Sequence, residues 1–235
     1  MTRFETSHCG GLRIELAGAT VTLRGSGALW LEVERTLVVA DLHFEKGSSY
    51  AARFGQMLPP YDTRETLDRL DREVAALAPD RLIFLGDSFH DGSAEGRLAP
   101  DDADRLRGLA KGRDLIWAVG NHDADGPRDL PGQIIDEANI LGLVLRHEPK
   151  GGLQPGEVSG HLHPAARVSS GRGSVRRRCF ITDGSRLILP AFGAYAGGLN
   201  VLDKAFLGLF GGPVLAAALG REKVHAIGRR SLRPD

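Results

Sequence analysis

The chain has 235 residues, which is the length of one domain or of one domain with an appendage. Hydrophobic residues make up 42% and charged residues 26%, so the composition excludes a disordered, collagen-like or coiled-coil chain. The 30 basic residues balance the 30 acidic ones, and no overall charge excess points to a nucleic-acid or membrane partner. We therefore expect a single globular domain over residues 1–235.

The distribution of charge and the cysteine content bear on the partners and the cellular compartment of the protein. Residues 1–149 hold 17 basic and 25 acidic residues, a net charge of −8, whereas residues 150–235 hold 13 and 5, a net charge of +8. Two cysteines are too few for a disulfide framework, and with no evident secretory signal we expect a cytoplasmic protein. The uncharged stretch 205–220 is shorter than the roughly 20 residues of a membrane span, so we expect it to be buried protein interior, with no membrane contact.

In chain order, the first forty residues alternate apolar and polar types in short runs, which predicts meandering strands. Thr36–Ala40, Arg81–Leu85 and Leu115–Val119 are short apolar runs typical of buried strands. Helical spacing predicts a helix from Asp62 or Thr63 to Pro79 and a second around Asp102–Ala110. This alternation indicates a mainly parallel sheet layered with helices, with ligands at the carboxyl ends of the strands.

The later part of the chain favours antiparallel strands. Strands are expected at Leu143–Leu145, at Glu157–Ser159 and on both sides of Asp183-Gly184, a pair that suits a hairpin turn. Ser169–Arg178, rich in Ser, Gly and Arg, is expected to be a mobile basic loop.

Polar residues gather at the predicted strand ends. Taken one at a time, each has an ordinary explanation as a turn, a helix cap or a buried histidine. Six of the eight histidines nevertheless occur there with two aspartates and an asparagine, which makes coincidence a poor account. The series reads Asp41-x-His43, Gly86-Asp87-x-x-His90, Gly120-Asn121-His122-Asp123, His147 and Gly160-His161-x-His163.

This series resembles that of the calcineurin-like metallophosphoesterases. The resemblance implies an α/β fold, a layered β-sandwich of mixed sheets flanked by helices, with the active site at the carboxyl ends of strands. It also implies that two divalent metal ions are bound, with a hydroxide between them that attacks phosphorus. By this resemblance one metal is ligated by Asp41, His43 and His163, the other by Asn121, His147 and His161, and Asp87 bridges them.

The chemistry of these residue types supports a transition metal independently. Imidazole mixed with carboxylate and amide oxygen suits manganese, iron or zinc better than calcium, and manganese is our first choice. A pair of such ions lowers the pKa of bound water and holds the attacking and departing oxygens in line. Hydrolysis of a phosphate ester is the reaction that such a site would carry out.

Three further residues are candidates for the chemistry itself. The resemblance implies that His122 stabilises the transition state and protonates the leaving oxygen. Asp123 either orients His122 or caps a following helix, and the sequence leaves both alternatives open. His90 stands where the phosphoprotein phosphatases of the superfamily have aspartate, so Gly-Asp-Ser-Phe-His is similar instead to the double-strand-break-repair nucleases, in which this histidine belongs to the active site.

Longer segments are similar to the bacterial DNA-ligase-associated metallophosphoesterases. They are Asp41–Lys46, the following loop Arg53–Pro60, Gly86–His90 and the Gly-rich stretch Leu189–Leu199. This resemblance implies a manganese-dependent phosphodiesterase or DNA endonuclease that works in DNA repair beside a DNA ligase and a helicase. The Gly-rich segment from Ala191 to Leu199 either lets backbone approach the site or packs tightly on a strand.

A basic run favours DNA as the partner. Arg176, Arg177 and Arg178 are expected to contact a nucleic-acid backbone, although a solvated basic face explains them almost as well. Only 14 residues are aromatic, and no predicted basic strand carries a series of aromatic residues. The sequence therefore offers no support for base stacking. The alternative function is hydrolysis of nucleotides or other small phosphate esters. A non-enzymatic scaffold is disfavoured because every expected ligand position holds suitable chemistry.

Overall fold

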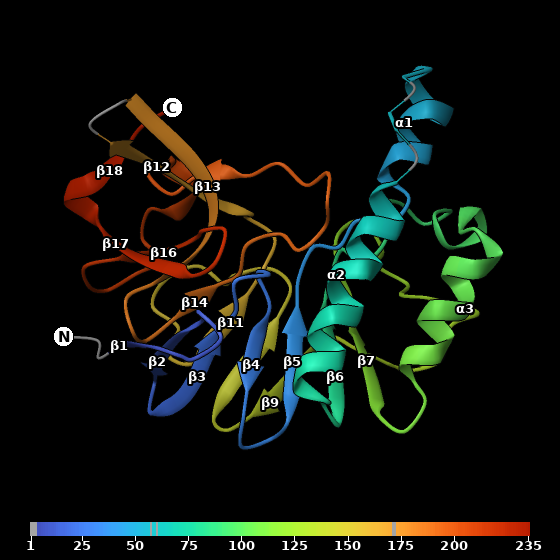
Figure 1. Cartoon of the computed structure of the whole chain (residues 1–235), viewed down its shortest axis with the longest axis horizontal. Helices are drawn as coiled ribbons and strands as arrows, with labels where there is room; N and C mark the ends of the chain where they lie inside the picture. The colour runs from blue at the N-terminus through green and yellow to red at the C-terminus, as the bar shows by residue number, and fades with distance from the viewer. Residues whose placement is uncertain (1–3, 57, 60, 171–172) are drawn as a thin grey trace.

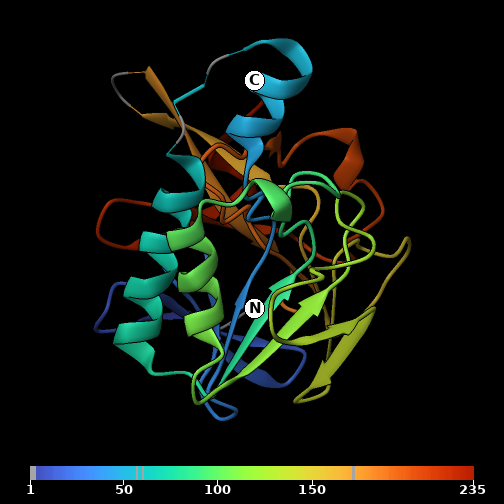
Figure 2. The same cartoon turned by 90° about the vertical axis from the view of Figure 1, so that its right-hand side faces the viewer.

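The computed structural model describes residues 4–56, 58–59, 61–170 and 173–235. Two β-sheets pack face to face, and two helices cover the outer face of the first sheet (Figure 1, Figure 2). The architecture is therefore an α/β layered sandwich of mixed sheets flanked by helices, as predicted.

The first sheet has the strand order β1 to β8. Its antiparallel half confirms the predicted meander, and β5 to β8 run parallel to one another. The strands are β1 (Phe4–Thr6), β2 (Leu12–Leu16), β3 (Ala19–Leu23), β4 (Leu29–Leu31), β5 (Thr36–Val39), β6 (Arg81–Leu85), β7 (Asp114–Ala118) and β8 (Gln133–Ile135). Because β5, β6 and β7 are parallel neighbours, the loops at their carboxyl ends share one edge of the sheet.

Helices α2 (Asp62–Leu77) and α3 (Pro100–Leu109) confirm the two predicted helices. Helix α2 buries Leu67 and Leu70 against the sheet, and Pro100 stands at the first position of α3, where the missing backbone N–H costs nothing. Helix α1 (Lys46–Phe54), which was not predicted from the sequence, extends from the loop after β5 at one end of the molecule (Figure 1).

The second sheet mixes parallel and antiparallel pairs. The expected antiparallel pairing holds for most neighbours, but β10, β11 and β14 are parallel, so the expectation was wrong for these three strands. Residues 147–156 return the chain along the sheet before β11 begins, as a parallel neighbour requires. The strands are β9 (Glu137–Ile140), β10 (Leu143–Arg146), β11 (Glu157–Ser159), β12 (Pro164–Ser170), β13 (Gly173–Thr182), β14 (Leu187–Ile188), β15 (Leu199–Asn200), β16 (Leu215–Leu219), β17 (Val224–Gly228) and β18 (Leu232–Arg233).

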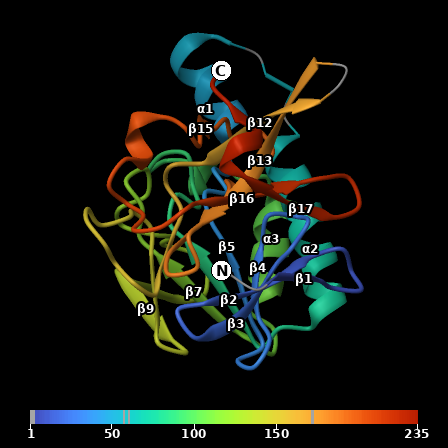
Figure 3. The same ribbon diagram turned by 90° about the vertical axis from the view of Figure 1, so that its left-hand side faces the viewer.

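The predicted mobile basic loop is also corrected. Apart from residues 171 and 172, which lie outside the described residues, the segment belongs to the β12–β13 hairpin, in which Val168 opposes Val175. Cross-strand pairing of this kind holds the segment in strands in spite of its basic composition. Strands β16 and β17 continue the second sheet beside β13 (Figure 3).

Alternate side chains of the parallel strands enter two different cores. Val38 of β5 packs between the sheets, whereas Leu37 and Val39 pack under α2 and α3. The uncharged stretch 205–220 is buried only in part, because Ala216 and Ala217 lie in the core while Leu207 is 76% exposed. Among the described residues, no helix combines the length and apolar character needed to cross a membrane.

Candidate metal centre and active site

The edges of the two sheets meet where the predicted ligands lie. Asp41, Asp87 and Asn121 follow β5, β6 and β7 of the first sheet, and His147 and His161 follow β10 and β11 of the second. Backbone hydrogen bonds continue past the ends of β5 and β6, and the N–H of His43 donates to the carbonyl of Asp87 at 2.9 Å. The N–H of His161 donates to the carboxylate of Asp41 at 3.0 Å, which joins the two sheets at this point.

The structure brings all seven predicted ligands together in two groups. In the first, Nε2 of His163 lies 3.3 Å from Nε2 of His43 and 3.3 Å from Oδ1 of Asp41. In the second, Nε2 of His147 lies 3.2 Å from Nδ1 of His161 and 3.0 Å from Oδ1 of Asn121.

The carboxylate of Asp87 reaches both groups. Its Oδ2 lies 3.9 Å from Nε2 of His43, and its Oδ1 lies 3.4 Å from Nε2 of His147. The backbone N–H of His122 donates to Oδ1 at 2.9 Å, which fixes the direction in which the carboxylate points. Asp87 thus occupies the position expected of a bridging ligand.

The backbone of the ligand loops is unusual. Five of the seven predicted ligands have φ between 46° and 66°, in the left-handed region that residues other than glycine rarely adopt. Strain of this kind is concentrated at functional sites and persists only where the surroundings impose it. The five residues are Asp41, His43, Asp87, His161 and His163.

The glycines of the motifs allow the loops to approach closely. A Cβ atom on Gly86 would collide with the imidazole ring of His147, and one on Gly120 would collide with the backbone and carboxylate of Asp87. Gly86 also has φ +76°, which disfavours any side chain. Glycine is therefore required at both positions for the two sheets to bring their ligands together.

Burial and charge set the protonation of the cluster. Asp41, His43, Asp87 and His147 are all at most 5% exposed. Burial and the neighbouring His163 lower the pKa of His43 to about 2, so its ring is neutral. Burial alone would lower the pKa of His147, but its contacts with Asp87 and Asp41 outweigh burial and raise it to about 9.

The donor set fits divalent metal ions. Ring nitrogens of His43 and His163 face each other at 3.3 Å, as do those of His147 and His161 at 3.2 Å, with carboxylate oxygens beside both pairs. Groups of this kind that converge on common points are ligands for transition metals, which replace protons on imidazole. Manganese, iron and zinc all suit these donors.

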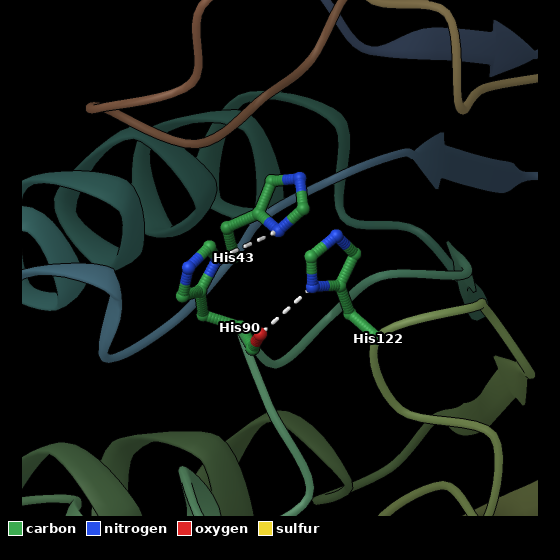
Figure 4. A group of neighbouring side chains, drawn as sticks. All are labelled: His43, His90 and His122. Atoms are coloured by element: carbon green, nitrogen blue, oxygen red, sulfur yellow. Dashed lines mark hydrogen bonds between the residues drawn. The ribbon is translucent and has the colours of Figure 1, made fainter. Parts of the chain in front are cut away.

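His90 and His122 lie beside His43 and are more exposed than it (Figure 4). The ring N–H at Nδ1 of His122 donates to the backbone carbonyl of His90 at 2.9 Å, and the two rings stack with centroids 5.2 Å apart. Nδ1 of His90 lies 3.5 Å from Nδ1 of His43. Burial and nearby Lys46 lower the pKa of His90 to about 4, so its ring is neutral at physiological pH.

Comparison with known proteins agrees with this geometry. The sequence profile of the calcineurin-like phosphoesterases matches residues 34–187, which hold all seven predicted ligands. The chain belongs to the calcineurin-like phosphoesterase family. None of the curated proteins matches the chain.

Two solved structures resemble this phosphoesterase. The nuclease MPE of Pseudomonas putida shares 30% sequence identity and a TM-score of 0.68, over 96% of this chain and 100% of that one. YfcE, a phosphoesterase from E. coli, shares 15% identity and a TM-score of 0.41, over 82% of this chain and 98% of that one.

Asp123 has neither of its two predicted roles in the phosphoesterase. Its carboxylate accepts hydrogen bonds from the backbone N–H groups of Ser88 and Phe89 at 2.7 and 3.1 Å, and from those of Asp87 and Gly120 at 3.1 Å each. The ring of His122 bonds instead to a carbonyl, and the next element is the strand β8 rather than a helix. Asp123 therefore ties the Asp87 loop to the Asn121 loop. Burial raises its pKa to about 6.

The three arginines of β13 that were predicted to contact DNA differ in their exposure and in their partners. Arg178 donates to the carbonyls of Ala191 and Gly193 at 2.8 and 3.0 Å, and burial lowers its pKa to about 10, so it is not free for DNA. Arg176 is exposed and pairs with Asp235 at 3.1 Å. Arg177 is exposed as well. Arg177 points to the opposite face of the strand from Arg176 and Arg178. Arg178 differs from Arg176 in being less exposed and tied to these carbonyls. A DNA-contacting role remains a prediction for Arg176 and Arg177 alone.

The Gly-rich segment braces the ligand loops. The N–H of Gly193 donates to the carbonyl of Asp41 at 3.1 Å, and a Cβ atom on Gly198 would collide with the carbonyl of His163. Arg69 of α2, like Arg178, donates to the carbonyl of Phe192. The segment thus both packs tightly and approaches the centre. Arg69 went unnoticed in the sequence because an arginine on a charged helix gives no signal of its partner.

Proposed function

We propose that this phosphoesterase is a two-metal phosphodiesterase that cleaves DNA as an endonuclease. The observation that carries the proposal is the placement of Asp87, whose two carboxylate oxygens each lie within 4 Å of a nitrogen in a different ligand group. The likeness to the nuclease MPE of Pseudomonas putida, over nearly the whole chain, supports a polynucleotide substrate.

The proposed reaction divides the work between bound ions and side chains. Asp87 and the six other ligands would hold two divalent ions, manganese being our choice, and the ions would activate water and neutralise charge on the phosphate. The carbonyl of His90 holds the Nδ1 proton of His122, so Nε2 is the atom that gives a proton to the leaving oxygen. Nε2 lies 3.9 Å from Oδ2 of Asp87, on the side of the metal ligands. His90 would face the same phosphate.

We further propose a setting in DNA repair, in the cytoplasm, where a nuclease removes or opens strands that a ligase and a helicase also handle. This part rests on the sequence resemblance of the segments around Asp41, Asp87 and Ala191.

The test is a substrate panel with the metal-loaded enzyme. We expect manganese-dependent cleavage of supercoiled plasmid and of bis(p-nitrophenyl) phosphate, and much slower release from p-nitrophenyl phosphate. Cleavage of plasmid should weaken steeply between low and moderate salt, because phosphate contacts release counterions. Hydrolysis of small esters without cleavage of any DNA would replace the proposal by the alternative of a small-substrate hydrolase. No hydrolysis of any ester by the metal-loaded protein would refute both.

A further inference from the structure

A row of aromatic rings leads from the proposed catalytic histidines onto α1. The rings of His122 and His90 stack with centroids 5.2 Å apart and an interplanar angle of 22°. The ring of Tyr50 lies 5.8 Å beyond His90, and that of Phe54 lies 5.6 Å beyond Tyr50. Each separation is within the range of direct aromatic contact, so the row is continuous.

The outer end of this row is open to solvent. Phe54 is 66% exposed on the last turn of α1, one helical turn from the partly buried Tyr50. Helix α1 projects at one end of the molecule, beyond α2 (Figure 1). A single exposed phenylalanine is ordinary, but the place of Phe54 at the end of a row that starts at the proposed catalytic histidines points to a ligand.

Positive charge accompanies the rings. Nζ of Lys46 lies 5.9 Å from the centroid of Tyr50, and Lys46 shares the helix face of Tyr50 and Phe54. Arg53 is 60% exposed, with a guanidinium nitrogen 3.7 Å from Asp91. Aromatic rings for bases beside cations for phosphates are the two parts of a surface that binds single-stranded nucleic acid.

The helix is held against the catalytic loop. Arg97 donates through two nitrogens to the carboxylate of Asp91, at 3.0 and 2.8 Å, and through Nε to the hydroxyl of Ser48 on α1 at 2.9 Å. Asp91 directly follows His90. This clamp fixes the position of Tyr50 relative to His90 before any substrate arrives, which lowers the cost of ordering the surface on binding.

We propose that Tyr50 and Phe54 stack on unpaired bases of the strand whose phosphodiester lies at the metal centre, while Arg53 contacts its backbone. The inference rests on the proposed function and specifies its substrate as DNA with unpaired bases beside the cleaved bond. Bases within a duplex have both faces covered by their neighbours and cannot use the row. The sequence offered no support for base stacking because no basic strand carries a series of aromatic residues, and the ring row on α1 supplies that support.

The experiment compares Phe54→Leu with Phe54→Trp and with Phe4→Leu. Phe4 is a 52% exposed phenylalanine on β1, away from α1, so Phe4→Leu is a matched control for the same exchange (Figure 1). The substrates are an oligothymidylate and an abasic strand with the same number of phosphates. Cleavage kinetics and the Kd from fluorescence anisotropy are measured for both strands.

Phe54→Leu is expected to raise KM and Kd for oligothymidylate by about 5-fold or more, with a much smaller change for the abasic strand. Phe54→Trp should bind oligothymidylate as tightly as the unmodified protein does, because tryptophan also offers a ring for stacking. Phe4→Leu should leave KM and Kd unchanged. If Phe54→Leu changes KM and Kd equally for the two strands, or for neither, the proposal that Phe54 stacks on bases is overturned. If no DNA is cleaved by any form, the proposed function fails, whereas the Kd values still decide whether Phe54 stacks on bases.

Discussion

Two polar regions of this phosphoesterase contrast sharply, the metal centre and the arginine run of β13. In the centre, Asp41 and His161 are 120 positions apart in sequence, yet the N–H of one donates to the carboxylate of the other. In the run, three consecutive arginines turn to different partners. Residues at the ends of parallel strands converge because these ends share one edge of the sheet. Along β13, Arg177 points away from Arg176 and Arg178 because a strand alternates its faces, and the latter two differ in their local partners. Spacing along the chain is therefore a guide to shared function only after the elements are known.

The largest effect is expected for a substitution of Asp87, the residue proposed to bridge the two ligand groups. Asp87→Asn removes the charge that both ligand groups share, so we expect the loss of at least one ion per chain and a fall in turnover of roughly 10³-fold. Metal content by inductively coupled plasma mass spectrometry and hydrolysis of bis(p-nitrophenyl) phosphate measure the two effects. Asp125→Asn, at an 81% exposed side chain, is the matched control. Two ions retained in Asp87→Asn would contradict the bridging role.

A second substitution separates chemistry from metal binding within the centre. His122→Asn should lower turnover by roughly 10²-fold while both ions stay bound, because the ring supplies a proton rather than a ligand. The same metal analysis and steady-state kinetics apply. His225→Asn, on the exposed part of β17, serves for comparison. Turnover that is unaffected by His122→Asn would remove this residue from the mechanism.

The smallest effects concern the two adjacent arginines of β13. Arg178→Ala leaves the carbonyls of the segment from Ala191 to Gly193 without their donor, and we expect it to lower the free energy of unfolding by about 1–3 kcal/mol. Arg177→Ala, at an exposed position, should change it by no more than about 0.5 kcal/mol. Urea denaturation of both variants gives the two values. Equal values would mean that the hydrogen bonds of Arg178 contribute no net stability.

Helix α1 shows where local patterns fail. Its sequence contains Gly47, Ser48 and Ser49, which are weak helix formers, and no side chain caps its first turn. Tertiary contacts support it instead, since the carboxylate of Asp62 accepts from the N–H of Gly47 and Arg97 donates to Ser48. A helix that is stabilised by tertiary contacts need not show helical periodicity in its sequence. The row of rings that ends at Phe54 could therefore not be predicted from the sequence either.

The sequence alone predicts the parallel strands and helices α2 and α3. It also predicts that a set of histidines and acidic residues lies at one edge of the sheet. These follow from periodicity and from the direction of parallel strands, which are properties of the chain itself. Only the folded molecule shows that Asp123 binds backbone rather than His122, that Arg178 is tied to a loop and that Tyr50 meets His90. Such pairings depend on which distant surfaces pack together, and local sequence carries no record of that choice.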